Sequence, residues 1–168
     1  MKSRSERYGM LTILIHWLTL LVLIAVYATI EIWGQSLEDW HILLGLLILP
    51  LLALRIVGRL IAPVPPIVPA LPAVQLKIAE FVHLLFYLIL LILPILGWLL
   101  VNARGGEAVI LGWTLPALIG PDPARAADLL DWHRLIAYVT YGLIAFHTLG
   151  TLFHHYGVKD NTVRRMLP

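Results

Sequence analysis

Four long apolar segments, separated by short polar or Pro-rich stretches, dominate the chain. Each is long enough for the roughly 20 residues that a membrane-spanning helix needs. They predict spans at about residues 8–33, 41–62, 78–103 and 129–157. The second span is the least regular, because it contains Pro50 and crosses only if Arg55 and Arg59 extend to a membrane edge. We therefore expect one all-α domain over residues 1–168, an integral membrane four-helix bundle.

Composition supports a membrane protein and narrows its chemistry. The 168 residues are 60% hydrophobic and 13% charged, with a mean hydropathy of +0.89, which is typical of a chain that lies in a lipid bilayer. The absence of cysteine excludes disulfides, thiolate-bound iron–sulfur clusters and covalent haem attachment through Cys-x-x-Cys-His. A metal site in this chain must therefore use histidine, carboxylate or methionine.

The basic residues predict the orientation. They stand at the ends of the apolar segments and not on one polar face, so they indicate membrane topology and no nucleic-acid partner. With both termini in the cytoplasm, nine basic residues are cytoplasmic: Lys2, Arg4, Arg7, Arg55, Arg59, Lys77, Lys159, Arg164 and Arg165. Three lie outside: Arg104, Arg125 and Arg134. This distribution favours a multi-pass membrane protein with both termini cytoplasmic.

The connections differ in character. Residues 63–72 contain five prolines and predict a stiff, extended cytoplasmic spacer. The outer connection, residues 104–127, is rich in Gly and Pro. Its apolar stretch Ile110-Leu-Gly-Trp-Thr-Leu-Pro116 leads us to expect a cap over the bundle.

Histidines are the candidate metal ligands. His133 and His147 are 14 positions apart, which places them almost on one helical face and roughly 21 Å apart along the axis. On the predicted topology His41 matches His133 in depth, near the outer edge. His16 and His83 both match His147, near the inner edge, and spacing alone does not choose between them.

Two stacked pairs of histidines favour haem. The macrocycle supplies four equatorial nitrogens, so the protein needs to provide only two axial imidazoles and apolar walls with room between them. Gly45 and Gly142 would leave such room, although glycines also serve helix packing in lipid. We expect two non-covalent, bis-histidine haems b. A di-iron site built on the two Glu-x-x-His motifs is excluded, because Glu38 and Glu80 would lie at opposite membrane edges.

The tail after the fourth span is polar. His154, Lys159 and Asn161 lie just below the inner histidines, where they could hydrogen-bond the carbonyls of a quinone. The same residues are also compatible with an ordinary interfacial anchor.

These motifs together resemble one known family. They are Ile15-His16-Trp17-Leu18, Trp40-His41 with Gly45, the Pro-Pro-Ile-Val-Pro linker, Leu93-Pro-Ile-Leu-Gly97, Trp132-His133, His147 and the ending from His154-His155-Tyr-Gly-Val-Lys-Asp-Asn to Pro168. Nearly end to end, they are similar to the bacterial cytochrome b561 family. The resemblance implies an outer haem held by His41 and His133 and an inner haem held by His16 and His147, which leaves His83 without iron.

The resemblance also implies an activity. Similar members are superoxide oxidases, which oxidise superoxide to dioxygen at the periplasmic face and pass the electrons through two haems to ubiquinone, with His154 next to the quinone. A cationic pocket would speed the arrival of superoxide, and Arg134, Arg104 and Arg125 are the candidates for it. Two alternatives remain. One is an electron conduit between a periplasmic redox partner and the quinone pool, and the other is a membrane protein that binds metal or assembles a complex without redox chemistry.

Overall fold

A computed structural model describes residues 7–167, so Lys2, Arg4 and the final Pro168 lie outside the described residues. Four long helices run through this part of the chain: α1 (Met10–Glu31), α2 (Glu38–Ile61), α3 (Ala73–Ala103) and α4 (Pro123–Phe153). All four are long and apolar enough to cross a membrane, which confirms the predicted all-α membrane bundle.

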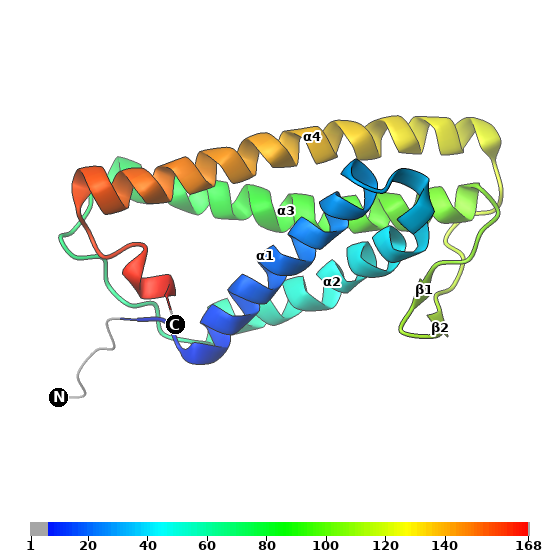
Figure 1. Cartoon of the computed structure of the whole chain (residues 1–168). Helices are drawn as coiled ribbons and strands as arrows, with labels where there is room; N and C mark the ends of the chain where they lie inside the picture. Colours follow the sequence, from blue (N-terminus) through cyan, green and yellow to red (C-terminus); the bar gives the residue numbers. More distant parts are fainter. Residues whose placement is uncertain (1–6, 168) are drawn as a thin grey trace.

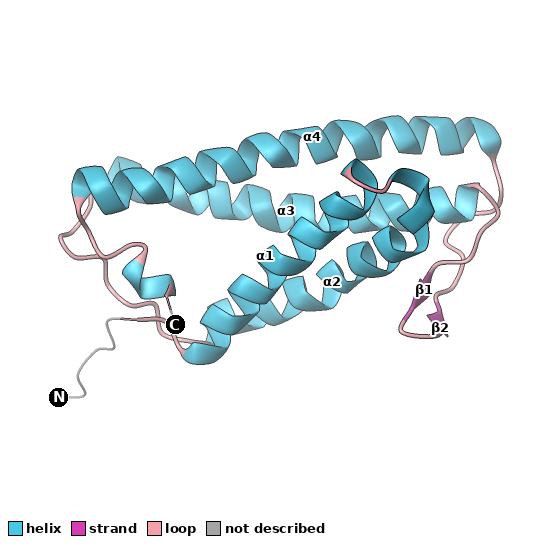
Figure 2. Ribbon diagram, viewed as in Figure 1, coloured by secondary structure: helices cyan, strands magenta, loops and turns pink. Residues whose placement is uncertain are grey.

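The helices form two antiparallel pairs. Figure 1 shows α3 and α4 side by side, with the pair α1 and α2 packed against them at an angle, and Figure 2 shows how little of the chain is not helical. The pairs contact each other mainly through α2 and α3. A cluster of Leu23, Ile48, Leu52 and Leu90 joins α1, α2 and α3 near the middle of the bundle. Many apolar side chains on the outer faces are exposed, as expected for surfaces that contact lipid.

Both later spans begin earlier than the sequence indicated. Helix α4 starts at Pro123 and not near residue 129, because the Asp122 carboxylate caps it by accepting a hydrogen bond from the Arg125 amide at 3.1 Å. Proline at the first helical position fits this start, since its missing N–H would have no helical partner there. Helix α3 starts at Ala73, directly after Pro72, and not near residue 78. Helix α2 continues through Pro50 to Ile61.

The connection between α3 and α4 contains a short hairpin. Strands β1 (Val109–Ile110) and β2 (Trp113–Thr114) pair across Leu111 and Gly112, which both have positive φ angles as two-residue hairpin turns require. Strand β1 contacts α2, but the side chains of Leu111 and Trp113 are 71% and 77% exposed. The expectation that this stretch covers the bundle is therefore wrong.

Both described ends of the chain lie at the opposite end of the bundle, which we call the tail end (Figure 1). The last described residues form a clamp there. The Tyr8 amide donates to the Arg165 carbonyl at 3.1 Å, and the Trp17 indole donates to the Met166 carbonyl at 2.8 Å. Arg165 itself is 6% exposed and donates to the carbonyl of Pro65 in the proline-rich linker. The end with the hairpin is called the hairpin end.

Candidate functional site

Five histidines inside the helices gather at two levels. At the hairpin end are His41 of α2 and His133 of α4. At the tail end are His16 of α1, His83 of α3 and His147 of α4. His133 and His147 belong to one unbroken helix, so they are separated by roughly 21 Å along its axis.

The hairpin-end pair has a geometry suited to a shared metal. The ring centroids of His41 and His133 are 6.1 Å apart, and two imidazoles that bind one metal ion from opposite sides have centroids about 6 Å apart. The Nδ1 of His41 lies 3.0 Å from the Val26 carbonyl oxygen, which can only accept a hydrogen bond. Nδ1 therefore carries the proton, and Nε2 keeps a lone pair for a metal. A backbone carbonyl in this role is common among metal-binding histidines.

The surroundings of this pair are mainly apolar. A cavity of about 50 Å³ lies between His41 and His133, and apart from them and Tyr27 its lining is apolar. Gly45 lines the cavity, and a Cβ built on it would have no neighbour within 4 Å. A Cβ on Gly97 would lie 3.4 Å from Cε1 of His133, so the helix backbone comes close to that ring. The Nδ1 atom of His133 is buried with no hydrogen-bond partner in the described chain.

At the tail end the structure brings His147 into contact with His83. Their ring centroids are 5.7 Å apart, and Phe86 packs edge-on against His147 at 5.4 Å. The Nδ1 of His83 donates to the Ala79 carbonyl at 2.7 Å, which leaves its Nε2 free. His83 therefore has the same metal-binding tautomer as His41.

His16 is arranged differently. A guanidinium N–H of Arg55 donates to its Nδ1 at 2.8 Å. Because arginine has no acceptor, Nδ1 must be the unprotonated nitrogen and the ring proton sits on Nε2. Binding of a metal through Nε2 of neutral His16 requires Arg55 to leave Nδ1. The structure thus places both His16 and His83 at the level of His147, as depth matching predicted, and does not by itself choose between them.

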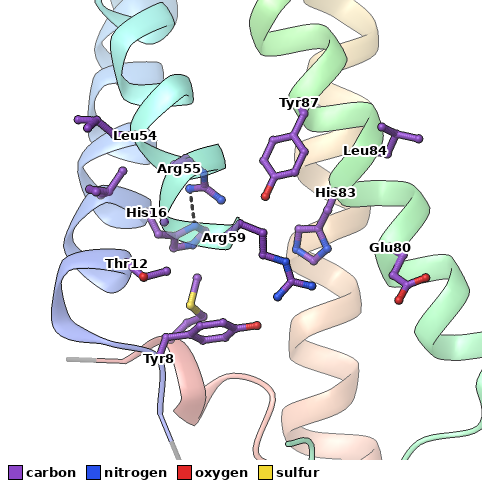
Figure 3. Close-up of a pocket in the computed structure, with 13 residues that line it drawn as sticks. Tyr8, Thr12, His16, Leu54, Arg55, Arg59, Glu80, His83, Leu84 and Tyr87 are labelled. Atoms are coloured by element: carbon purple, nitrogen blue, oxygen red, sulfur yellow. Dashed lines mark hydrogen bonds between the residues drawn. The ribbon is translucent and has the colours of Figure 1, made fainter. Parts of the chain in front are cut away.

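A larger cavity, of about 250 Å³, opens beside these tail-end histidines (Figure 3). Arg55 and Arg59 enter it from α2, and His83 and Tyr87 enter it from α3. We refer to it as the tail-end cavity. Sequence reasoning used both arginines as topology signals only and missed them as lining residues.

The three arginines considered for anion steering have different partners. Arg104 pairs with Glu38 at 3.0 Å, and Arg125 pairs with Asp122 at 3.7 Å. Arg134 is exposed and has no carboxylate within ion-pair distance in residues 7–167. Of the three, Arg134 keeps its charge uncompensated by a direct partner.

Among the candidate residues of the tail, His154 has a buried hydrogen-bond partner. His154 Nδ1 lies 2.6 Å from the Asp160 carboxylate, whose side chain is fully buried. Burial alone would raise the pKa of Asp160, but hydrogen bonds from Thr162 and from His154 outweigh it and lower that pKa below its ordinary value. Sequence reasoning missed Asp160, although its spacing of six from His154 was visible.

The other two tail candidates have different environments. Asn161 is engaged with the linker, since its side chain accepts from the Val68 amide at 2.9 Å and donates to the Pro66 carbonyl at 3.3 Å. Lys159 is exposed and adopts the left-handed backbone conformation just after the helical turn His154–Val158. Gly142 is also exposed, and a Cβ built there would have no neighbour within 4 Å. His154 is thus the tail residue that a buried partner orients.

Comparison with known proteins finds similarity to prokaryotic b561 cytochromes. The sequence model of the family described as prokaryotic cytochrome b561 matches residues 7–168. A probable superoxide oxidase, CybB, of Yersinia pestis is 36% identical over 170 residues, with 97% of each chain covered. Two Escherichia coli K12 proteins are also similar. Cytochrome b561 homolog 1 is 34% identical, with 97% of this chain and 98% of the relative covered, and homolog 2 is 28% identical, with 98% and 93% covered.

Proposed function

The chain belongs to the prokaryotic cytochrome b561 family of haem-binding membrane electron-transfer proteins, and on this premise we propose that it is a di-haem superoxide:ubiquinone oxidoreductase. It oxidises superoxide to dioxygen at the periplasmic face and delivers the electrons to ubiquinone near the cytoplasmic face. Oxidation of two superoxide ions supplies the two electrons that reduction of one quinone to quinol requires, together with two protons.

One observation carries the proposal: the 6.1 Å separation of the His41 and His133 rings at one end of the bundle. The same helix α4 then supplies His147 at the other end. In this assignment His41 and His133 hold the outer haem, and His16 and His147 hold the inner one, as the family resemblance implies. When bound, the haems supply one-electron carriers at the two levels.

Orientation follows from charge. The tail end carries Arg7, Arg55, Arg59, Lys77 and Arg165, so the positive-inside rule makes it the cytoplasmic end in a bacterial inner membrane. The hairpin end then faces the periplasm, where Arg134 is the exposed cation without an ion-pair partner in the described chain. A positive charge at that place would attract the superoxide anion.

The tail residues would bind the quinone and deliver protons to it. The Asp160 carboxylate accepts from Nδ1–H of His154, which fixes that tautomer and leaves Nε2 to accept or donate a proton at a quinone carbonyl. An imidazolium at this position would keep one N–H on Asp160 and present the other to a quinone carbonyl. Glu80 is a further proton carrier on the cytoplasmic side, and Lys159 lies exposed beside this site. Asn161 would act mainly by holding the linker.

The name of the Yersinia relative supports superoxide as the electron donor, and the overlap covers nearly the whole of both chains. The first test is spectroscopic. The protein purified from membranes should bind two haems b per chain and show a split or broad α band in its reduced-minus-oxidised spectrum. A purified protein without a haem spectrum would contradict the proposed function.

A further inference from the structure

The polar groups that line the tail-end cavity are mostly hydrogen-bond donors. Arg55 and Arg59 provide guanidinium groups, and Tyr8, Thr12 and Tyr87 provide hydroxyls. Figure 3 shows both guanidinium groups and the Tyr87 hydroxyl directed into the opening. Arginine offers N–H donors in a planar fork and no acceptor, so such a lining suits a group that only accepts, such as a carboxylate.

Neither arginine has a carboxylate within ion-pair distance in residues 7–167. Arg55 is half-buried inside a span and makes one side-chain hydrogen bond within residues 7–167, to the neutral ring of His16. Arg59 has no ion pair in the same residues. Glu80 also lines the cavity, but it is exposed and lies beyond His83 from both guanidinium groups in Figure 3. A cation at membrane depth is costly unless a partner neutralises it.

A third guanidinium adds to this positive charge. Arg165 lies against Tyr8, one of the cavity's lining residues, with its guanidinium carbon 5.1 Å from the ring centre. Its Nε is buried and has no hydrogen-bond partner in the described chain. Burial, with a smaller contribution from the nearby charge of Arg59, lowers the pKa of Arg165. Arg165 therefore adds positive charge behind Tyr8, beside the cavity that Arg55 and Arg59 line.

We propose that Arg55 and Arg59 form a carboxylate site that binds the propionate groups of the inner haem. This inference rests on the proposed haem assignment. The cavity, of about 250 Å³, would receive the polar edge of such a cofactor, and the imidazoles of His16 and His83 line the same cavity. A propionate is a better partner for Arg55 than the neutral His16 ring, because ionic hydrogen bonds are about twice as strong as neutral ones. Movement of Arg55 to the carboxylate would release Nδ1 of His16, which iron binding through Nε2 requires.

The test compares haem b with its dimethyl ester, which has the same ring and iron but no carboxylates. The full chain is produced without haem, loaded in a neutral detergent with either compound, and its low-spin absorbance is followed to give the affinity at each level. We expect the tail-end level to prefer haem b over the diester by about tenfold for each arginine contact. In the Arg55→Gln/Arg59→Gln variant this preference should fall to about one.

Lys77→Gln is the matched control, because it removes an exposed positive charge at the same end without lining the cavity. It should keep the preference of the unmodified chain. Equal affinity of the unmodified chain for haem b and the diester at the tail-end level would overturn the proposal, and so would a preference that survives loss of both arginines. Binding of an anionic lipid instead predicts no discrimination between the two compounds, which is the same contrary outcome.

Two other outcomes of this experiment also have a clear meaning. If the Gln variant does not accumulate in membranes, the comparison of haem b with its diester on the unmodified chain alone decides. A chain that binds neither compound would contradict the proposed haem function, whereas haem binding without discrimination would contradict only the carboxylate site.

Discussion

The ring centroids of His41 and His133 lie 6.1 Å apart, although the two residues come from α2 and α4, which are distant in sequence. Both rings lie at the same level of the bundle, and they line one small, mainly apolar cavity. The Val26 carbonyl holds His41 in the tautomer that leaves Nε2 available. This pair is the strongest structural indication of a haem site in the molecule.

Removal of either member of the pair should cost one haem. We expect His41→Ala and His133→Ala each to reduce haem content from two to about one per chain, because a bis-histidine iron loses half of its protein ligands. The measurement is the pyridine haemochrome assay against protein concentration. His155→Ala, at the tail end, is the control and should retain both. Loss of both haems from each variant would show that the pairing is wrong.

Two histidines, His16 and His83, compete as the second ligand of the inner haem. His16→Ala should lose the inner haem while His83→Ala keeps it, as the family resemblance implies. The structure makes this a demanding comparison, since His83 is the histidine in ring contact with His147 at 5.7 Å. Low-temperature spectra of both variants give the answer. An intact spectrum for His16→Ala with a lost band for His83→Ala would reassign the ligand.

Quinone reduction should depend on His154. In His154→Ala both haems should remain, but their reoxidation by a soluble ubiquinone should slow by roughly a hundredfold, the lower range for loss of a positioned proton donor. Stopped-flow absorbance of the pre-reduced protein measures this rate. His155→Ala again serves for comparison, because no buried carboxylate holds His155 in the described chain. Unchanged reoxidation of His154→Ala would make the residue an interfacial anchor only.

Superoxide arrival should depend on Arg134 more than on the other outer arginines. Arg134→Ala should lower the rate of haem reduction by superoxide several-fold at low ionic strength and flatten its dependence on salt. Arg104→Ala and Arg125→Ala should have smaller effects, because these residues already pair with Glu38 and Asp122. Pulse radiolysis at several salt concentrations measures the three variants. An identical salt profile for Arg134→Ala would remove it from the steering role.

Asp160 should stabilise the tail clamp in a pH-dependent way. Its pKa is lower in the folded protein than in the unfolded chain, so its contribution is present above the ordinary value of 3.8 and disappears as the pH falls through the folded pKa. Asp160→Asn should therefore lower the opening free energy of residues 159–167 by about 1–3 kcal/mol at pH 7 and by much less at a pH below the folded pKa of Asp160. Amide hydrogen exchange measures this difference. An equal loss at both pH values would show that the substitution acts through packing and not through the charge of the Asp160 carboxylate.

Hydrophobic runs were sufficient to predict four spans, and α2 shows why a proline did not prevent this: Pro50 lies inside an otherwise continuous apolar helix. The early start of α4 followed from Asp122 and Pro123, a capping signal outside the apolar run. Spacing predicted that His41 meets His133, because depth depends only on distance along each helix. It did not predict the contact of His83 with His147, since that depends on the rotation of α3, nor the fully buried carboxylate of Asp160, which depends on how the tail folds back.

Electron transfer from superoxide to quinone by this chain alone can be tested in one titration. Superoxide is generated at a known rate over the purified, oxidised protein with excess soluble ubiquinone, and quinol and dioxygen are measured together. We expect both haem bands to become reduced when quinone is absent. When quinone is present, we expect one quinol for every two superoxide ions consumed beyond spontaneous dismutation. Haem bands that respond to dithionite but not to superoxide, with no quinol formed, would contradict electron transfer by this chain alone and favour an electron conduit that needs a protein partner.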